Sequence, residues 1–269
     1  MSLEFLSHLA EMGATNIHPA GRQATERLIA ALDLQAGNRV LEIGCGTAET
    51  MVRILHQHAV SVEGLDILPE MLRAARLRLS LTGCAGRSKL YQAQIGAPLP
   101  VAAAAYDRVY TESALGFQDA SVACALLAEI YRVLKPGGLY VANEAVWKRG
   151  TPEETVQAVN AACLRDFGLR AAAECAWSVD DWLRLMREAG FRVLSADTLE
   201  TQAQNPALPN GAAGSLGLWL SNALTLGYKV RARFVPRLMR QRARYRRLVA
   251  QPRAEGRFME ARLFVVQKE

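Results

Sequence analysis

The sequence predicts an α/β protein built on an open, mostly parallel sheet, and three neighbouring segments lead to that prediction. Residues 39–43 form an apolar run that ends abruptly in Gly-Cys-Gly at 44–46. Apolar residues at helical spacing follow over 51–55, and a second apolar run over 60–66 ends in an aspartate. A strand, a glycine turn, a helix and a second strand in this order form the beginning of a nucleotide-binding βαβ unit.

The glycine turn suits a ligand that approaches the backbone closely. Glycine has no Cβ atom and adopts the tight reversal that such a turn requires. The dinucleotide fingerprint needs Gly or Ala three residues after Gly46, but this chain has Glu49 there, and a carboxylate would repel a pyrophosphate. We therefore expect a nucleoside ligand without a phosphate, and we expect Thr47 to be the N-cap of the helix behind the turn.

Later motifs carry a family resemblance. Asp66 lies twenty residues after Gly46, where a carboxylate can accept hydrogen bonds from a ribose diol. With Asp-Arg-Val at 107–109, Leu-Lys-Pro-Gly-Gly at 134–138 and Glu-Ala-Gly-Phe at 188–191, the chain resembles the class I S-adenosylmethionine-dependent methyltransferases, most of all their type 11 small-molecule group. The resemblance implies a Rossmann-like sheet of seven strands in the order 3-2-1-4-5-7-6, with an antiparallel last strand and helical cap insertions.

The remaining core elements follow from periodicity and turn signals. Helices are expected from Arg22 to Leu32 and over 67–81, where Pro69 suits a first turn. Ser178 should begin a helix that ends at Gly190. Strands are expected over 89–93, 106–110, 139–142, 191–199 and 258–266.

Segments outside the sheet are expected to surround the site. The chain is interpreted as one methyltransferase domain with its core at about 20–147, 191–199 and 257–268. An N-terminal arm over 1–20 is amphipathic at its start, and in the type 11 group such an arm commonly folds over the cofactor end of the sheet. A helical cap over 148–190 should cover the substrate pocket. Candidate pocket-lining aromatic residues are Trp147, Phe167 and Trp177.

A basic helical insert over 200–256 sets the charge of the chain. An apolar stretch from 216 to 226 is followed by an Arg-rich helix expected over 228–249. From Lys229 to Arg257 there are eleven Lys or Arg and one acid, a net charge of +10, which leaves −4 for the rest of a chain whose total is +6. Three interpretations stay open: a helix that covers the substrate pocket with its apolar face, peripheral contact with an anionic membrane through 229–257, and contact with RNA. A nucleic-acid partner is the least expected.

The resemblance implies S-adenosylmethionine as the cofactor. Glu42 stands where family members bond the amino-acid end of the cofactor, and Asp66 where they bond the ribose. The Asp-Ala pair expected after the third strand is replaced by Gln94-Ile95, and Gln94 offers an uncharged acceptor to the adenine amino group. The full set of expected cofactor contacts is Glu42, Gly44, Cys45, Gly46, Asp66, Ile67, Gln94, Ile95 and Thr111.

Methyl transfer from a sulfonium carbon requires alignment of the acceptor, and a base helps only where the acceptor carries a proton. Glu112 and Glu144 are expected to emerge at the same rim from neighbouring strands and to position the acceptor. His18 is a third catalytic candidate, in a lid formed by the arm, with hydrogen bonding to the backbone at the helix entry as the alternative. No metal site is expected.

These observations predict a cytoplasmic methyltransferase acting on an O, N or C atom of a small-molecule metabolite. The chain lacks both the Asn/Asp-Pro-Pro-Tyr/Phe motif of exocyclic and amide nitrogen methylation and the Pro-Cys of C5-cytosine methylation. A length of 269 residues fits one domain, and the five scattered cysteines are interpreted as isolated thiols. The sequence shows neither a secretory signal nor an apolar run near the ~18–20 residues of a membrane span. The alternatives are a lipid or quinone-type acceptor at the membrane surface, and a non-catalytic protein that binds the cofactor. Oligomeric state is not indicated.

Overall fold

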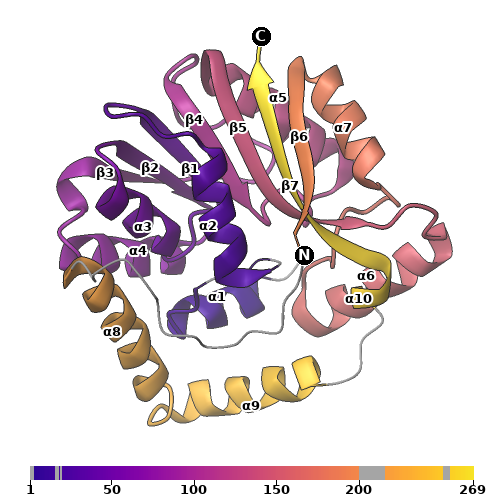
Figure 1. The fold of residues 1–269 in the computed structure, drawn as a ribbon. Coiled ribbons are helices and arrows are strands. Elements are labelled where there is room, and N and C mark those ends of the chain that lie inside the picture. Colours follow the sequence, from indigo (N-terminus) through magenta and orange to yellow (C-terminus); the bar gives the residue numbers. More distant parts are fainter. Residues whose placement is uncertain (1–2, 16–17, 19, 200–215, 251–254) are drawn as a thin grey trace.

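The computed structural model describes residues 3–15, 18, 20–199, 216–250 and 255–269 (Figure 1). Its sheet has seven strands in the order β3-β2-β1-β4-β5-β7-β6, which confirms the predicted order. β7 runs antiparallel to both of its neighbours, β5 and β6, and the pairs among β1 to β5 are parallel. The strands are β1 (Arg39–Ile43), β2 (Ser61–Asp66), β3 (Ser88–Gln92), β4 (Tyr106–Glu112), β5 (Leu134–Trp147), β6 (Phe191–Leu199) and β7 (Met259–Lys268).

Helices cover both faces of the sheet because each face carries its own apolar cluster. On one face, α2 (Gly21–Ala31), α3 (Glu49–Gln57) and α4 (Pro69–Leu81) contribute to a buried cluster with β1 and β2. On the other face, α5 (Ala120–Val133) and α7 (Val179–Glu188) pack against β4 to β7. β1 lies between β2 and β4, so the strand order reverses beside it and leaves a crevice at the carboxyl ends of these strands.

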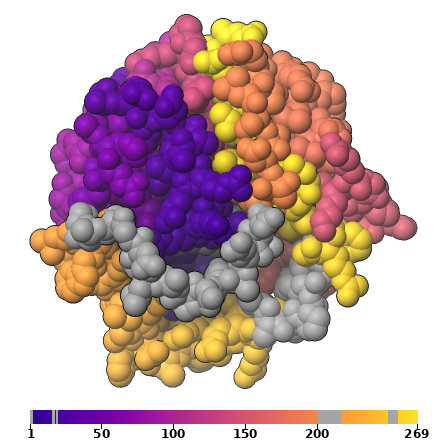
Figure 2. Space-filling model, in the orientation of Figure 1, coloured from indigo at the N-terminus to yellow at the C-terminus, as the bar shows by residue number. Residues whose placement is uncertain are grey.

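Five further helices and a short 3-10 turn, η1 (Ala85–Arg87), complete the described part of the chain. α1 (Glu4–Glu11) lies below the carboxyl ends of the strands, and its Ala10 packs against Leu68 and Met71 of the α4 region. α6 (Glu153–Phe167) flanks the same edge from the other side (Figure 1). α8 (Leu216–Arg231) and α9 (Pro236–Ala250) form a ledge beneath the core, visible as a rim in Figure 2, and α10 (Glu255–Phe258) leads into β7. None of the described helices is both long and apolar enough to cross a membrane.

Two local predictions were wrong for reasons of backbone geometry. Ala48, not Thr47, is the N-cap of α3, and it has φ 61°, a left-handed conformation. The Thr47 hydroxyl instead donates to the carbonyl of Ala14. In the insert the chain breaks over 232–235 rather than near residue 227, because Pro236 begins α9 and a proline is favoured at a first helical turn.

Candidate active site

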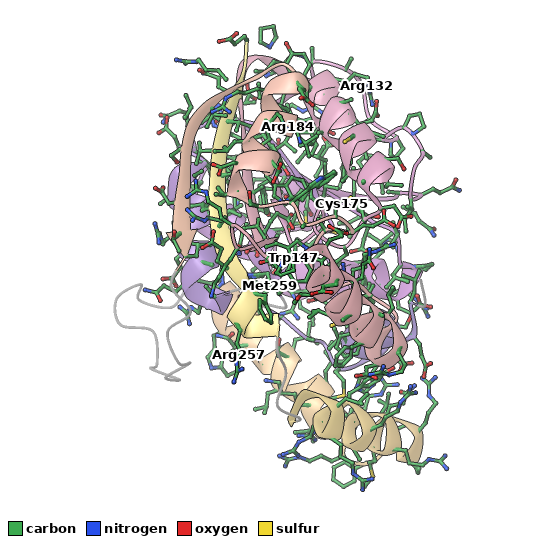
Figure 3. All side chains as sticks on the ribbon, turned by 90° about the vertical axis from the view of Figure 1, so that its right-hand side faces the viewer. Arg132, Trp147, Cys175, Arg184, Arg257 and Met259 are labelled. Atoms are coloured by element: carbon green, nitrogen blue, oxygen red, sulfur yellow. The ribbon has the colours of Figure 1, made fainter. Side chains whose placement is uncertain are left out.

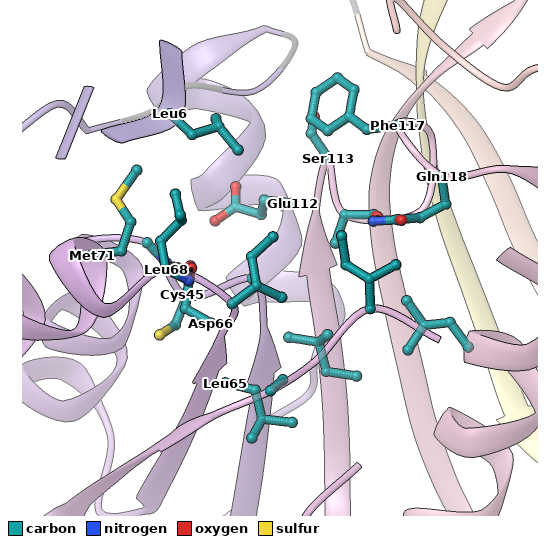
Figure 4. Close-up of a pocket in the computed structure, with 18 of the residues that line it drawn as sticks. Leu6, Cys45, Leu65, Asp66, Leu68, Met71, Glu112, Ser113, Phe117 and Gln118 are labelled. Carbon is teal, nitrogen blue, oxygen red and sulfur yellow. Dashed lines mark hydrogen bonds between the residues drawn. The ribbon is translucent and has the colours of Figure 1, made fainter. Parts of the chain in front are cut away.

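A cavity of about 760 Å³ opens at the carboxyl ends of β1, β2 and β4 (Figure 4). Its volume falls within the ~300–1,000 Å³ typical of small-molecule sites. One end is lined by the glycine turn after β1 and by the residues that follow β2 and β3. The other end is lined by α1, the loop after β4, α5 and the end of α6. The same cavity therefore joins the predicted cofactor residues to a second region, lined by the arm, the loop after β4 and the cap, which we call the second chamber.

The turn after β1 is held open by Asp66 from the end of β2. Gly44 has φ +80°, a conformation that favours glycine, and a Cβ atom there would make a tight contact of 3.3 Å with the Ala114 side chain. The backbone N–H of Gly46 donates to Asp66 Oδ2 at 2.8 Å, and that of Leu68 donates to Oδ1 at 2.9 Å. Burial raises the pKa of Asp66, against the opposing effect of these N–H donors. Each carboxylate oxygen retains capacity to accept one more hydrogen bond, which suits a diol.

Glu42 brings a carboxyl group to the same end of the cavity. Its side chain is 4% exposed and lines the cavity, and its Oε2 atom has no hydrogen-bond partner among the described residues. Burial, followed by the charge of Glu112, raises the pKa of Glu42 well above its usual range. A buried carboxyl with an unused oxygen is satisfied when a cation arrives beside it. This position thus fits the ammonium of an amino-acid group.

Apolar side chains flank the space beyond Asp66. Ile67, Leu68 and Met71 line the cavity from the start of α4, and Gln94 and Ile95 line it from the loop after β3. Ile95 is 46% exposed, an apolar surface that a flat ring could cover. The structure therefore brings Glu42, the glycine turn with Cys45, Asp66, Ile67, Gln94 and Ile95 to one end of one cavity.

Glu112, at the end of β4, is fixed by three side chains. Its Oε1 atom accepts a hydrogen bond from Thr50 Oγ1 at 2.7 Å, and Oε2 accepts one from Thr25 Oγ1 at 2.8 Å. His18 Nε2 lies 2.9 Å from the same Oε2 atom. Burial on its own would raise the pKa of Glu112, but the bonds from His18, Thr50 and Thr25 outweigh it and hold this pKa below the usual range. Glu112 lies at the cavity wall as an anchored carboxylate.

His18 ties the N-terminal arm to the sheet. Besides the contact with Glu112, its Nδ1 atom lies 2.9 Å from Asn143 Nδ2 on β5. Both ring nitrogens are thus engaged, one by the last residue of β4 and the other by a residue within the neighbouring strand β5. The arm is positioned over the site as expected, while the ring itself is held in a hydrogen-bonded network.

Two expected site residues do not reach the cavity. Glu144 is 1% exposed and accepts hydrogen bonds from the backbone N–H groups of residues 114–116. Burial raises the pKa of Glu144, in opposition to these donors. Thr111 is fully buried and bonds to Tyr140 and Glu144. The expectation that Glu144 shares a rim with Glu112 fails because β5 continues to Trp147, which places Glu144 inside the strand. Thr111 points away from Glu112 because side chains alternate along a strand.

Of the three candidate aromatic residues, only Phe167 lines the cavity. Trp147 is completely buried near the paired Met259, where its indole N–H donates to the carbonyl of Ala173 (Figure 3). Trp177 packs edge-on against Trp182, with 5.2 Å between the ring centroids. Both serve the packing of the cap.

Ser113 is a site residue that the motifs did not single out. It follows Glu112 directly, has φ 58°, and lines the cavity. Its hydroxyl is buried without a hydrogen-bond partner among the described residues. A strained backbone and an unpaired polar atom in one residue are features that concentrate at functional sites. Its place after an acid at a strand end was the only signal in the sequence.

The family described as "Methyltransferase domain" matches residues 40–138, the segment that carries the glycine turn, Asp66 and Glu112. The chain carries a class I S-adenosylmethionine-dependent methyltransferase domain. S-adenosylmethionine is the cofactor of this domain, and the cavity end described above fits it, because an unpaired carboxyl oxygen, a glycine cradle and a carboxylate with spare acceptor capacity stand in succession.

Relatives of the methyltransferase include "Methyltransferase GfsG" from Streptomyces halstedii, 29% identical over 72% of this chain and 66% of that protein. "O-methyltransferase resE" from Aspergillus sclerotiorum is 30% identical over 64% of this chain and 62% of that protein, so the matched segment spans less than two thirds of each relative. Among solved structures, geranyl diphosphate C-methyltransferase from Streptomyces coelicolor, in complex with S-adenosyl-L-homocysteine, has a TM-score of 0.61 at 17% identity and covers 92% of this chain and 80% of that one. That likeness concerns the fold.

Proposed function

We propose that the enzyme methylates a small, largely apolar molecule bound in the second chamber of the cavity. The observation that carries this proposal is the continuity of one cavity from the glycine turn to a chamber with an apolar lining. The N-terminal arm, the loop after β4, α5 and the cap each contribute to it. Apolar side chains that line the cavity from the arm, the loop after β4 and the cap include Phe5, Phe117, Cys163, Phe167 and Leu169. Such a chamber favours a neutral acceptor with a substantial hydrocarbon or aromatic surface.

Ser113 is proposed to hold the polar group of the acceptor. Its unpaired hydroxyl lies at the end of β4, between the cofactor end and Phe117 in Figure 4. A hydrogen bond there would fix the direction of the acceptor, and alignment is the main requirement of a displacement at a methyl carbon. Glu112, Thr25, Thr50 and His18 are proposed to position this wall rather than to touch the acceptor.

We propose that the described part of the chain aligns the acceptor without supplying a dedicated base. The cofactor brings a methyl group on a positively charged sulfur, which is already electrophilic. Glu112 is a weak base because its hydrogen bonds hold its pKa low, and both ring nitrogens of His18 are engaged. We therefore propose an acceptor that loses its proton readily, such as a phenol or an enol. An oxygen acceptor also agrees with the name of the relative from Aspergillus sclerotiorum, an O-methyltransferase.

The test is an acceptor screen with the purified protein and S-adenosylmethionine labelled in the methyl group. Transfer is expected to apolar phenols and enols, and the rate should rise with pH along the acceptor's own pKa, so that acceptors of different acidity shift the profile. Transfer confined to strongly charged metabolites, or a profile that ignores the acceptor's pKa, would contradict the proposal.

A matched pair of variants tests the role of Ser113. Ser113→Ala removes one neutral hydrogen bond, worth about 0.5–1.5 kcal/mol, and should lower kcat/KM roughly 2–12-fold. Ser121→Ala is the control, since Ser121 is exposed at the start of α5. Equal activity of both variants would remove Ser113 from the acceptor site.

A further inference from the structure

The large apolar side chains of α8 lie on its solvent-exposed face, whereas a helix that packs only within its own chain would turn them toward the core. Leu216, Trp219, Leu226 and Val230 recur at spacings of three, seven and four residues, so they lie on one face of the helix. All four are exposed, Trp219 to 63%. We call these four residues the outer stripe. Phe234, at the corner between α8 and α9, is 78% exposed and adds to it.

The opposite face of α8 is docked so tightly that the outer stripe cannot turn inward. A Cβ atom on Gly217 would lie only 2.1 Å from His56 Nε2. The fully buried guanidinium of Arg78 donates to the Ser221 hydroxyl at 2.7 Å and to the Ser221 carbonyl at 3.0 Å. A further bond from Arg78 reaches Thr225 Oγ1 at 3.1 Å. Small and polar residues therefore face the core, and the large apolar residues are left outside.

Basic side chains surround the exposed apolar residues. Lys229, Arg231 and Arg233 lie beside the outer stripe and Phe234, and all three are exposed. Within the described part of the chain none of the three has a carboxylate partner. On α9, some arginines have carboxylate partners: Arg237 pairs with Glu11 and Arg244 with Glu4 of α1, and these ion pairs hold α9 against the arm. The further exposed basic residues of α9 are Arg240, Arg246 and Arg247.

We propose that the outer stripe, Phe234 and their flanking basic residues form a docking surface for an anionic lipid bilayer. Aliphatic and tryptophan side chains enter the headgroup region, while Lys and Arg attract acidic headgroups, so such a bilayer satisfies both parts of the surface at once. RNA would neutralise the arginines but leave the apolar side chains in water. A second copy of the chain, placed symmetrically, would bring the same positive charges together.

Vesicle co-sedimentation of the full chain tests the proposal. Binding is expected to vesicles that contain phosphatidylglycerol, to be much weaker with pure phosphatidylcholine, and to decline with added salt because the charge attraction is screened. Trp219 provides a second readout. Trp147 and Trp182 are fully buried and Trp177 is half-buried against Trp182, so lipids brominated in the acyl chain should quench mainly the 63% exposed Trp219. Trp219→Phe is the spectroscopic blank.

Paired variants separate this surface from general basicity. Arg231→Glu/Arg233→Glu should weaken binding at least about 25-fold, from a contribution of about fivefold per basic residue near an anionic surface. Arg187→Glu/Arg192→Glu makes the same charge change on α7 and β6, at the edge of the sheet away from α8, and should have a much smaller effect (Figure 1). Trp219→Ser/Phe234→Ser should also weaken binding, whereas Leu194→Ser, an exposed apolar residue of β6, should not.

Three results would overturn the proposal. One is failure of the vesicle assay, either as no binding to anionic vesicles or as an equal loss of binding in test and control variants. Another is a concentration-dependent dimer in sedimentation analysis that Trp219→Ser dissolves, which would make the outer stripe an interface between copies. A third is tight binding to RNA that anionic vesicles do not compete away. None of these readouts depends on methyl transfer, so they stand apart from the acceptor screen.

Discussion

Replacing Glu42 by glutamine should change stability and cofactor affinity in opposite directions. In the ligand-free protein, Glu42 is buried, keeps an oxygen without a partner in the described structure, and has a raised pKa. An acid whose pKa is raised on folding destabilises the folded state once the pH rises above the ordinary pKa of the group, which is 4.5 for glutamate. Glu42→Gln removes that penalty, so the melting temperature of the ligand-free variant should exceed that of the wild type at neutral pH and converge with it below pH 4.5.

Affinity should fall in the same variant. A hydrogen bond to a charged partner contributes about 1.5–3 kcal/mol, so loss of the carboxylate should weaken S-adenosylmethionine binding roughly 10–150-fold. Binding of a cation beside Glu42 also favours its ionised form, so the wild type should release a proton on binding and Glu42→Gln should not.

Isothermal titration calorimetry measures both quantities when it is repeated in buffers with different ionisation enthalpies. Thermal unfolding without ligand measures the stability effect over the same pH range. An affinity equal to that of the wild type, or unchanged proton release, would refute the placement of the amino-acid end at Glu42.

Three further predictions concern the same site and its supports. Asp66→Ala should weaken S-adenosylmethionine binding by about 1–3 kcal/mol in calorimetry, and an unaffected affinity would place the ribose elsewhere. The pKa of Glu112 is lowered in the folded protein, so its ionised form stabilises the fold above pH 4.5, and this stabilisation is lost as the pH falls through the folded pKa. In urea titrations at several pH values, Glu112→Gln should therefore lose less stability on acidification than the wild type. A larger loss would contradict the hydrogen-bond network. Gly217→Ala should lower the free energy of unfolding by about 1–3 kcal/mol because its Cβ atom would clash with His56. Gly227→Ala has open space around it and should raise the free energy of unfolding by about 0.5–1 kcal/mol. Equal effects of the two variants would mean that α8 is not docked as described.

The fold could be predicted because its signals are local and repeated. An apolar run that ends in Gly44 and Gly46, and another that ends in Asp66, are each recognisable within a few residues. The spacing between these two runs then predicts that the ends of the two strands lie side by side at one edge of the sheet. The capping of α3 was not predictable in the same way, because the positive φ of Ala48 follows from the path of the turn and not from residue preference.

The candidate site was predictable where the functional residues lie at or close to the end of a strand. Asp66 and Glu112 are the last residues of β2 and β4, so both reach the cavity edge. Glu144 was misplaced because no sequence signal shows that β5 continues three residues beyond it. Thr25 and Thr50 come from separate helices, and their convergence on Glu112 is a result of tertiary packing that no short motif records.

The buried guanidinium of Arg78 joins two distant parts of the chain in a single hydrogen-bonding group. It donates to the carbonyl of Thr47, directly behind the glycine turn, and to the carbonyl of Ser221 on α8. A cofactor that stabilises the turn and a surface that stabilises docked α8 therefore act on one shared group. By thermodynamic reciprocity, if bound cofactor raises the affinity of α8 for its surface by some factor, the bound surface raises the affinity for the cofactor by the same factor. The described part of the insert, 216–250, lines none of the cavity, so Arg78 is the hydrogen-bonded route through which it would be linked to methyl-donor binding.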